Sequence, residues 1–383
     1  LEPILEKSAN AFKQKCGSCN GYSYTPRTVD ICWICDEKVH IKCLRGTLGC
    51  VSCLKNVYPG FECHGYELLD KLPNSSNNTF YNPYHSSHFT QQLGNLLDDE
   101  LDRGEAWSEL STLLQSCKYK EPKETPEPKA DELNILSLNI QSIVSKFTDL
   151  RENIDKLVGY DIICLNETNC QMSKLPHGKC DLELDGFHEP IVREPIRKSG
   201  RGGGLIMYVN KRVGSVDNIV EFDPNPEPSN TAGEFQFVKI QNCKQQRRTI
   251  IVGNVYRSPS RKASSFIELY EAVLHRVQSK HSNKLIYVVG DLNLDLIKHS
   301  TDSACRDLID VSAAKGFAQV VSRPTRITDH SATLIDHVYT NSLDATMSCN
   351  IITFDISDHL AVHTKAKLAN NTVLSKIQHT KTS

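Results

Sequence analysis

From residue 132 onwards, short apolar runs rich in β-branched residues alternate with amphipathic stretches. The apolar runs predict strands, and apolar residues at helical spacing predict helices over 143–157 and 266–277. Buried strands with outer helices predict an α+β fold, a four-layer α/β sandwich of two packed mixed β-sheets flanked by helices. The predicted strands cover 132–140, 160–168, 202–210, 234–240, 249–257, 284–293 and 334–341, with further runs on either side of Ser357.

The chain upstream of these strands has two different textures. A cysteine-rich stretch predicts a small zinc finger, and a polar stretch follows it that has helical spacing of apolar residues only between Phe89 and Cys117. Residues 118–130 are rich in proline and charge, which is typical of an exposed linker. The predicted domains are a zinc finger over 12–65, a partly helical linker over 66–131, a sheet domain over 132–368 and a disordered tail over 369–383.

Composition narrows the function classes. The net charge of −2 excludes a global polycation, so any nucleic-acid-binding surface must be local. The sequence contains no apolar run long enough for a transmembrane helix, and we expect no membrane partner. Of 15 cysteines, eight lie in the first 63 residues and the others are scattered, which indicates metal binding in a reduced compartment rather than a secreted disulfide framework. The sequence does not reveal the oligomeric state.

The first 53 residues contain four pairs of metal-ligand residues, each pair separated by two positions. This spacing lets one tight turn direct both side chains at the same ion. Eight ligands are enough for two tetrahedral Zn²⁺ sites, and sites filled by protein ligands are structural. The pairs are Cys16 and Cys19, Cys32 and Cys35, His40 and Cys43, and Cys50 and Cys53.

The order of four cysteines, one histidine and three cysteines resembles a PHD finger. The resemblance implies interleaved zinc sites and a histone tail as a candidate partner. Only six residues separate Cys43 from Cys50, so the loop that helps PHD fingers bind a histone tail is shortened. The resemblance would place Cys16, Cys19, His40 and Cys43 on one Zn²⁺ and Cys32, Cys35, Cys50 and Cys53 on the other.

In the second domain, polar residues suited to phosphate chemistry stand where apolar strands end. A carboxylate at such a position costs free energy unless a partner binds it, and oxygen ligands of this type suit magnesium. Taken alone, each residue is equally compatible with a solvated strand end or a turn. The candidate catalytic residues are Asn139, Glu167, Tyr256, Asp291, Asn293, Asp336, Asp358 and His359.

The order of these residues along the chain resembles the endonuclease/exonuclease/phosphatase superfamily over nearly the whole second domain. The resemblance implies a phosphodiester hydrolase that uses Mg²⁺ or Mn²⁺. It implies that Glu167 holds the metal, together with Asn139 or a nearby aspartate, and that Asp358 supports the metal side. The tyrosine hydroxyl of Tyr256 is expected to donate to a phosphate.

The same resemblance implies roles for the remaining residues. Asp291 would take a proton from the attacking water, and Asn293 would orient that water or the phosphate. Asp336 would pair with His359, whose imidazole would contact a non-bridging phosphate oxygen. Thr325 is also expected to touch the phosphate.

Four short sequence motifs make the resemblance more specific, to the nicking domain of LINE-type (non-LTR) retrotransposons. These motifs are LNIQSI at 138–143, GGGLIMYV at 202–209, YRSP at 256–259 and the segment 323–337. The resemblance implies DNA as the substrate, a 3′-hydroxyl product, and a nuclear or otherwise cytoplasmic location. Because a reverse transcriptase follows the nuclease in that branch, we expect this chain to be a truncated copy or a fragment.

Basic residues near the predicted site are expected to contact DNA phosphates. Two alternatives remain open: a phosphodiesterase or phosphatase of the same fold acting on inositol lipids or sphingomyelin, and a chromatin-binding PHD-like module with a passenger nuclease domain. The basic residues are Arg193, Arg197, Lys198, Arg201, Lys211, Arg212, Arg257, Arg261, Lys262, Arg323 and Arg326.

Overall fold

The structure is a computed structural model, and it describes most of the chain from residue 109 to residue 368. Its contacts divide the chain into two units: an N-terminal unit of Leu1–Thr79 with Arg326–Thr333, and a sheet domain of Phe80–Thr325 with Leu334–Ser383. The described residues are 109–122, 126–196, 202–299, 301–328 and 331–368, together with the backbone of six short strands between residues 14 and 50.

The first sheet of the sheet domain is built around β8 (Glu132–Asn139), whose eight residues are all buried. Side chains alternate along a strand, so Leu136 and Leu138 pack in the hydrophobic cluster on one face of the sheet, while Asn139 points to the opposite face. β8 runs parallel to β9 (Ile162–Asn166) and antiparallel to β21 (Ala361–Lys367), which makes the sheet mixed. The strand order is β10 (Ile191–Arg193), β11 (Leu205–Val209), β9 (Ile162–Asn166), β8, β21 (Ala361–Lys367), β20 (Thr346–Ile352) and β7 (Tyr119–Lys120).

The second sheet has six strands and is also mixed, because β14 (Ile250–Tyr256) and β15 (Leu285–Asp291) are parallel while the other neighbouring strands are antiparallel. The central strands β14 and β15 are buried along their whole length, as expected of strands covered on both faces. The strand order is β12 (Ile219–Phe222), β13 (Glu234–Ile240), β14 (Ile250–Tyr256), β15 (Leu285–Asp291), β19 (Asp336–Thr340) and β16 (Ala318–Gln319).

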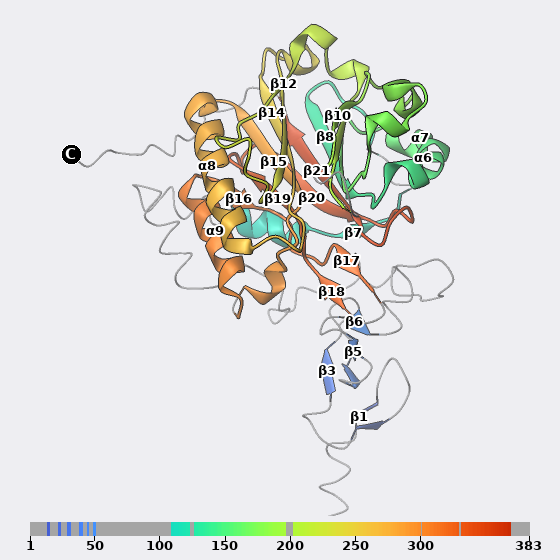
Figure 1. Ribbon diagram of the computed structural model, residues 1–383. Coiled ribbons are helices and arrows are strands. Elements are labelled where there is room, and N and C mark those ends of the chain that lie inside the picture. Colours follow the sequence, from blue (N-terminus) through green and yellow to red (C-terminus); the bar gives the residue numbers. More distant parts are fainter. Residues whose placement is uncertain are drawn as a thin grey trace, which may run out of the picture. The chain divides into compact units, whose positions relative to one another are not determined.

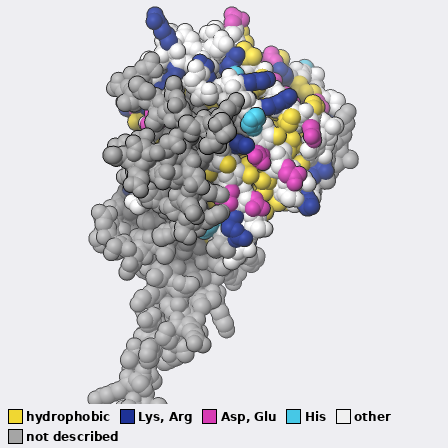
Figure 2. All heavy atoms as spheres, turned by 90° about the vertical axis from the view of Figure 1, so that its left-hand side faces the viewer, with side chains coloured by type: hydrophobic (Ala, Val, Ile, Leu, Met, Phe, Trp, Pro, Cys, Tyr) yellow, Lys and Arg dark blue, Asp and Glu magenta, His cyan; other side chains and the backbone are white. Residues whose placement is uncertain are grey.

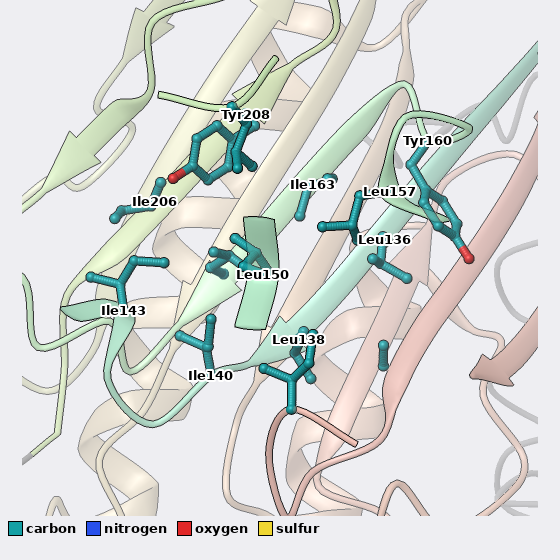
Figure 3. Close-up of a cluster of buried hydrophobic side chains, with 14 of the residues drawn as sticks. Leu136, Leu138, Ile140, Ile143, Leu150, Leu157, Tyr160, Ile163, Ile206 and Tyr208 are labelled. Atoms are coloured by element: carbon teal, nitrogen blue, oxygen red, sulfur yellow. The ribbon is translucent and has the colours of Figure 1, made fainter. Parts of the chain in front are cut away.

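Helices cover the outer faces of both sheets, so the sheet domain has the layered architecture that the sequence predicts (Figure 1). The helices α6 (Ile143–Glu152) and α7 (Ile154–Leu157) lie on one side, over a cluster of buried hydrophobic side chains (Figure 3). On the other side lie α8 (Ala263–His281) and α9 (Ser303–Ala314). No helix in the described part of the chain has the length and apolar character to cross a membrane.

Residues 109–122, which the sequence assigns to the linker, belong to the sheet domain instead. Residues 109–116 are helical, and β7 adds a parallel strand beside β20. Leu110 and Leu114 are buried, and the carbonyl of Leu114 accepts a hydrogen bond of 2.6 Å from the Ser322 hydroxyl. Sequence texture hides this because β7 is only two residues long and lies next to a proline-rich, charged stretch.

The described strands of the N-terminal unit form short antiparallel pairs. β1 (Gln14–Lys15) pairs with β2 (Tyr22–Ser23), β3 (Val29–Ile31) with β4 (Lys38–His40), and β5 (Leu44–Arg45) with β6 (Gly49–Cys50). β17 (Arg326–Ile327) and β18 (Ala332–Thr333) form a further pair in this unit. The side chains of the predicted zinc ligands, and the predicted tail over 369–383, lie outside the described residues.

Candidate active site

The two sheets meet at a carboxylate, Asp291, the last residue of β15. Asp291 is fully buried, and its Oδ2 accepts a hydrogen bond of 2.8 Å from the Asn139 amide at the end of β8. Asn293 donates its backbone N–H to Oδ1 at 2.8 Å and its side-chain amide to Oδ2 at 3.1 Å. Asn293 takes a left-handed backbone conformation with φ of +50°, which folds the strand end back over the carboxylate. Three of the predicted residues therefore form one cluster.

Two asparagines that the sequence analysis missed support this cluster from the sheet interface. The Asn166 amide donates to Asn254 at 2.7 Å, and its Oδ1 accepts from the backbone N–H of Asp291 at 3.2 Å. Both asparagines are fully buried. A buried amide without partners would cost free energy, so these bonds join the strand ends that carry the site. The available signal was an asparagine inside each apolar run, in ICLN and in IIVGN.

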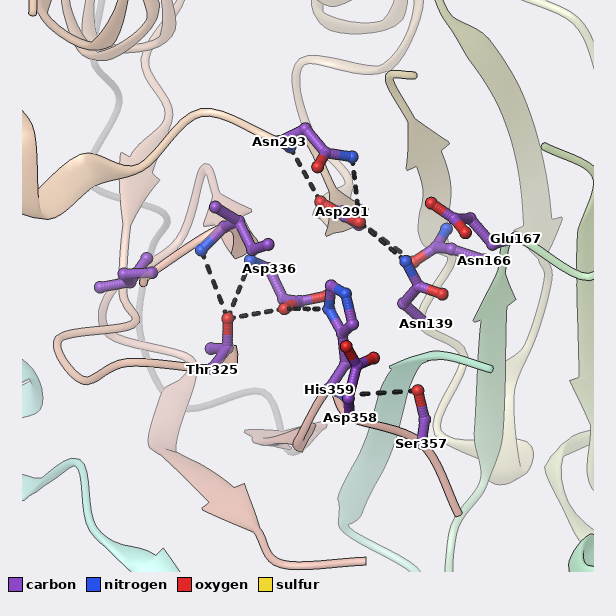
Figure 4. Close-up of polar contacts among 12 residues, drawn as sticks. Asn139, Asn166, Glu167, Asp291, Asn293, Thr325, Asp336, Ser357, Asp358 and His359 are labelled. Carbon is purple, nitrogen blue, oxygen red and sulfur yellow. Dashed lines mark hydrogen bonds and ion pairs between the residues drawn. The ribbon is translucent and has the colours of Figure 1, made fainter. Parts of the chain in front are cut away.

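A second cluster pairs an imidazole with a carboxylate. His359 Nδ1 lies 2.9 Å from Oδ2 and 3.1 Å from Oδ1 of Asp336, and both residues are buried. The Thr325 hydroxyl donates to Asp336 Oδ2 at 2.6 Å and accepts from the backbone N–H of Asp336 at 3.0 Å. Figure 4 shows these contacts as one chain from Thr325 through Asp336 to His359, with Asp291 close by.

The charges of the two clusters influence each other. Burial raises the pKa of the Asp291 carboxyl to about 7, and the nearby negative charge of Asp336 raises it as well. Burial on its own lowers the pKa of His359, but the charge and hydrogen bond of Asp336 outweigh it and raise the pKa to about 9. Near neutral pH, the site therefore contains a protonated imidazole and a carboxyl group able to exchange a proton.

Glu167 stands beside these clusters, on the turn that follows β9. It has a φ of +50°, an uncommon conformation for a residue with a side chain. Its Oε1 accepts a hydrogen bond of 2.7 Å from the Tyr256 hydroxyl, and it forms no ion pair with any described residue. Burial, followed by the charge and hydrogen bond of Glu167, raises the pKa of Tyr256. Tyr256 thus donates its hydroxyl to Glu167 in this structure, and its predicted donation to a phosphate stays a prediction.

Asp358 lies next to His359 at the edge of the same group (Figure 4). The amide of Gln141 donates to Asp358 Oδ1, and the backbone N–H of Gln141 donates to Asn139 Oδ1 at 3.1 Å. Gln141 also has a positive φ, of +58°. This glutamine therefore links two of the predicted residues, Asn139 and Asp358, and sequence reasoning gave it no role.

Thr325, for which a phosphate contact is predicted, and His337 both make hydrogen bonds within the protein. Thr325 is fully buried and its hydroxyl donates a hydrogen bond to Asp336, so its role is to orient that carboxylate. His337, which follows Asp336, points elsewhere: its Nε2 donates to the carbonyl of Leu294 at 2.9 Å. Burial lowers the pKa of His337 to about 4, which keeps the ring neutral.

Among the described residues, Asp291, Asp336 and His359 offer ligand atoms within 4.8 Å of one another. A histidine binds a metal through a ring nitrogen that carries no proton, and His359 Nδ1 is engaged with Asp336 in a ring whose pKa is raised. This trio is therefore better suited to acid–base chemistry than to metal binding. Glu167 retains free oxygen lone pairs beside Asn139, and such oxygen donors fit a hard divalent cation.

Several basic residues expected to bind DNA make intramolecular contacts. Arg193 pairs with Asp223 at 2.6 Å, and Arg212 pairs with the buried Asp161 at 2.7 Å. Arg257 is buried, with only 5% of its surface exposed, and its guanidinium donates to four backbone carbonyls. On the described surface visible in Figure 2, basic and acidic side chains are interspersed. Arg197, Lys198 and Arg201 lie outside the described residues.

Comparison with known proteins places this fold and site in a family. The model of the endonuclease/exonuclease/phosphatase family matches residues 136–359, which span all eight candidate catalytic residues. The chain belongs to the endonuclease/exonuclease/phosphatase family, whose members hydrolyse phosphodiester bonds. A search of curated protein sequences found no match.

Several solved structures match this chain at low sequence identity. An apurinic/apyrimidinic (AP) endonuclease from Leishmania major, LMAP, is 13% identical with a TM-score of 0.52, over 68% of this chain and 98% of that one. The endonuclease domain of TRAS1, a telomere-specific non-LTR retrotransposon, is 16% identical with a TM-score of 0.45, over 62% and 99%. A humanized D. rerio TDP2 is 13% identical with a TM-score of 0.44, over 62% and 99%.

Proposed function

We propose that this protein is a divalent-metal-dependent DNA endonuclease of the LINE-type retrotransposon branch, which nicks its target and leaves a 3′-hydroxyl. The observation that carries the proposal is that two clusters lie together: Asp291 is held by Asn139 and Asn293, His359 is held by Asp336, and Asp291, Asp336 and His359 have atoms within 4.8 Å of one another. One cluster can accept a proton from water, and the other presents a positive charge to a phosphate.

Glu167 is the proposed principal ligand of Mg²⁺ or Mn²⁺, with Asn139 or Asp358 as further oxygen donors. Its carboxylate meets one hydroxyl and no cation among the described side chains, which suits a group that binds an ion. Its strained backbone also fits a functional position. When bound, the metal would stabilise negative charge on the phosphate and on the leaving oxygen.

Residues of this chain supply the remaining chemistry. Asp291 removes a proton from a water molecule, and Asn293 holds the Asp291 carboxylate in place for that transfer. The water oxygen then bonds to phosphorus while the bond from phosphorus to the 3′ oxygen breaks, and the departing 3′ oxygen takes a proton from solvent. His359 Nε2 makes no hydrogen bond with a described residue, so it remains available to donate to a non-bridging oxygen. The products are a 3′-hydroxyl and a 5′-phosphate.

Support for DNA as the substrate and for the retrotransposon branch comes from sequence motifs around the site, namely LNIQSI, GGGLIMYV and YRSP. The LMAP protein, an AP endonuclease with the same fold, is consistent with a nucleic-acid substrate. A nuclear location and two structural Zn²⁺ ions in the N-terminal unit are parts of the same proposal. The zinc content of the purified chain, measured by atomic emission, should be two per molecule.

The test is conversion of supercoiled plasmid to open circle by the full chain with Mg²⁺. We expect nicking by the parent, about 10²-fold or more slowing by Glu167→Ala, and none in EDTA. Glu189→Ala is the matched control, because Glu189 is an exposed carboxylate paired only with Lys179. Extension of the nicks by a DNA polymerase without prior end repair would establish the 3′-hydroxyl.

A folded parent that leaves plasmid DNA intact in Mg²⁺ and in Mn²⁺ would overturn the nuclease proposal. Hydrolysis of inositol phospholipids or sphingomyelin by that protein would then favour the alternative phosphodiesterase. Binding of histone peptides without any hydrolysis would favour the chromatin-binding alternative. Nicking that Glu167→Ala leaves unchanged would remove Glu167 from the metal site.

A further inference from the structure

Glu234 is a buried carboxylate that the proposed mechanism does not use. It is the first residue of β13, opposite Tyr256 of β14, and only 8% of it is exposed. Its Oε2 accepts a hydrogen bond of 2.6 Å from the backbone N–H of Gly204, and its Oε1 accepts one of 3.1 Å from Ile196. Burial raises its pKa, and these two N–H donors and the charge of Arg193 only partly oppose that rise. Burying a carboxylate is costly, so a role for this position is expected.

The three glycines next to Glu234 need their glycine backbone. Gly202, Gly203 and Gly204 have φ of +91°, +93° and +83°, a region that residues with side chains rarely adopt. A Cβ on Gly203 would lie 2.6 Å from Glu234 Oε1, and one on Gly204 would lie 2.7 Å from the Thr168 hydroxyl. The glycine run is therefore pressed between Glu234 on one side and the turn after β9 on the other.

The far side of the glycine run holds the turn that carries Glu167. The backbone N–H groups of Thr168 and Asn169 donate to Gly204 and Gly203 carbonyls at 3.1 Å and 2.9 Å. The backbone N–H of Gly202 donates to Asn169 Oδ1 at 2.7 Å. Asn169, like Glu167, has a positive φ, of +49°. A turn with two residues in this conformation needs external bonds to keep its shape, and the glycine run supplies three.

We propose that Glu234 is a positioning residue for the metal site: through Gly202–Gly204 it fixes the turn that aims the Glu167 carboxylate. This inference rests on the proposed role of Glu167 as the metal ligand. Outer groups that orient a metal ligand commonly change metal affinity without touching the ion. Here the connection runs through backbone hydrogen bonds across a glycine run, so both ends of the connection can be altered by substitution.

The experiment is direct Mn²⁺ binding by the full, zinc-loaded chain, followed by electron paramagnetic resonance, for the parent, Glu234→Gln and Glu234→Ala. A glutamine can accept only one of the two N–H bonds at full strength, and an alanine accepts none. We expect Mn²⁺ affinity to fall about tenfold for Glu234→Ala and by less for Glu234→Gln. Nicking at saturating Mn²⁺ should recover toward the parent rate, because the reacting groups are intact.

Matched controls separate positioning from general destabilisation. Glu132→Gln removes another buried carboxylate, at the opposite end of β8 from Asn139, where it pairs with Lys365 at 2.6 Å. It should lower the melting temperature and leave Mn²⁺ affinity unchanged. Gly203→Ala should displace the glycine run by a clash with Glu234, and should therefore weaken Mn²⁺ binding. Gly214→Ala introduces only ordinary van der Waals contacts and should leave Mn²⁺ binding unchanged.

The outcomes discriminate between the two proposals. A parent that binds Mn²⁺, with Glu234→Gln and Gly203→Ala binding it equally well, overturns the positioning role and leaves the proposed function intact. A parent that binds no Mn²⁺ overturns the metal site and the positioning role together. If Glu234→Ala does not fold, Glu234→Gln and Gly203→Ala still decide the question.

Discussion

The Asn139 amide donates a hydrogen bond of 2.8 Å to Asp291 across 152 residues of sequence. Asn139 ends a strand of one sheet and Asp291 ends a strand of the other, so this bond sets how the two sheets present the site. The side chain of Asn139 faces the interior because it follows the inward phase of β8. A change in how the two sheets pack would therefore also change the geometry of the site.

Replacing Asn139 with alanine should slow nicking about 10²-fold, because a proton acceptor misplaced by about 1 Å loses that much. The stability loss should be about 1–3 kcal/mol, as a buried hydrogen bond is removed. Asn134→Ala is the matched control: Asn134 lies on the same strand, is fully buried, and bonds with His363 at 3.0 Å. It should destabilise by a similar amount, measured by urea unfolding, and leave the nicking rate of the folded protein near that of the parent. Equal loss of activity in both variants would contradict the specific role of Asn139.

Leu114→Ala should lower the free energy of unfolding of the sheet domain by about 2–5 kcal/mol, the usual cost of emptying a buried leucine site. Leu114 is 3% exposed and lies in the helical residues that the sequence assigns to a linker. Gln115→Ala, one position along on the exposed face, should change stability by less than about 0.5 kcal/mol. Urea unfolding followed by circular dichroism measures both. If Leu114→Ala were as mild as Gln115→Ala, this segment would not be part of the folded domain.

Long, strongly patterned elements could be predicted from the sequence because they leave a local signal, and the candidate catalytic residues could be proposed from their order along the chain. The apolar runs of β8, β14 and β15 indicate buried strands, and each ends in a polar residue that the site uses. The connections between those residues leave no such signal. Nothing local indicates that Tyr256 bonds to Glu167, or that Thr325 bonds to Asp336, since each bond joins separate strands.

Short strands, and the hydrogen bonds that charged side chains make within the protein, could not be predicted from the sequence either. The two residues of β7 acquire strand geometry only by pairing with β20. The basic residue Arg257 resembles a DNA contact in a list of charges, but tertiary packing assigns its guanidinium to backbone carbonyls. In both cases the deciding partner lies far away in the chain, and only the assembled sheets bring it into contact.

Arg257→Lys should slow nicking about tenfold without changing the salt dependence of DNA binding. The guanidinium donates to the carbonyls of Leu292 and Asn293 at 2.7 Å and 2.6 Å, and so holds the loop that carries Asn293. Lysine keeps the charge but lacks the planar fork that makes these bonds. Each phosphate contact contributes about 0.9 to the slope of log affinity against log salt concentration. Because lysine would still neutralise a phosphate, the salt slope is also measured for Arg257→Gln, with Ca²⁺ in place of Mg²⁺, and should equal that of the parent. A slope smaller by about 0.9 for Arg257→Gln would show that Arg257 contacts DNA after all.

Stability should fall on acidification partly through His363, and His363→Gln should reduce that fall. Burial, together with the charges of Lys120 and Lys365, lowers the pKa of His363 to about 3, against about 6.5 in an unfolded chain. Between these values the unfolded chain binds a proton that the folded chain does not, so stability decreases as the pH falls below about 6.5. The expected contribution between pH 7 and pH 5 is about 2 kcal/mol. A glutamine can still donate to Asn134, as His363 does, but it does not titrate.

The measurement is urea unfolding of the parent and of His363→Gln at pH 7 and pH 5. Other groups titrate in this range, and Asp291 opposes His363 because its raised pKa makes the folded state the better proton acceptor. The difference between the two proteins in their stability change cancels those shared contributions. That difference should be about 2 kcal/mol, with the parent losing more. Equal losses would show that His363 is protonated in the folded state at pH 5, and that its bond to Asn134 does not require the neutral ring.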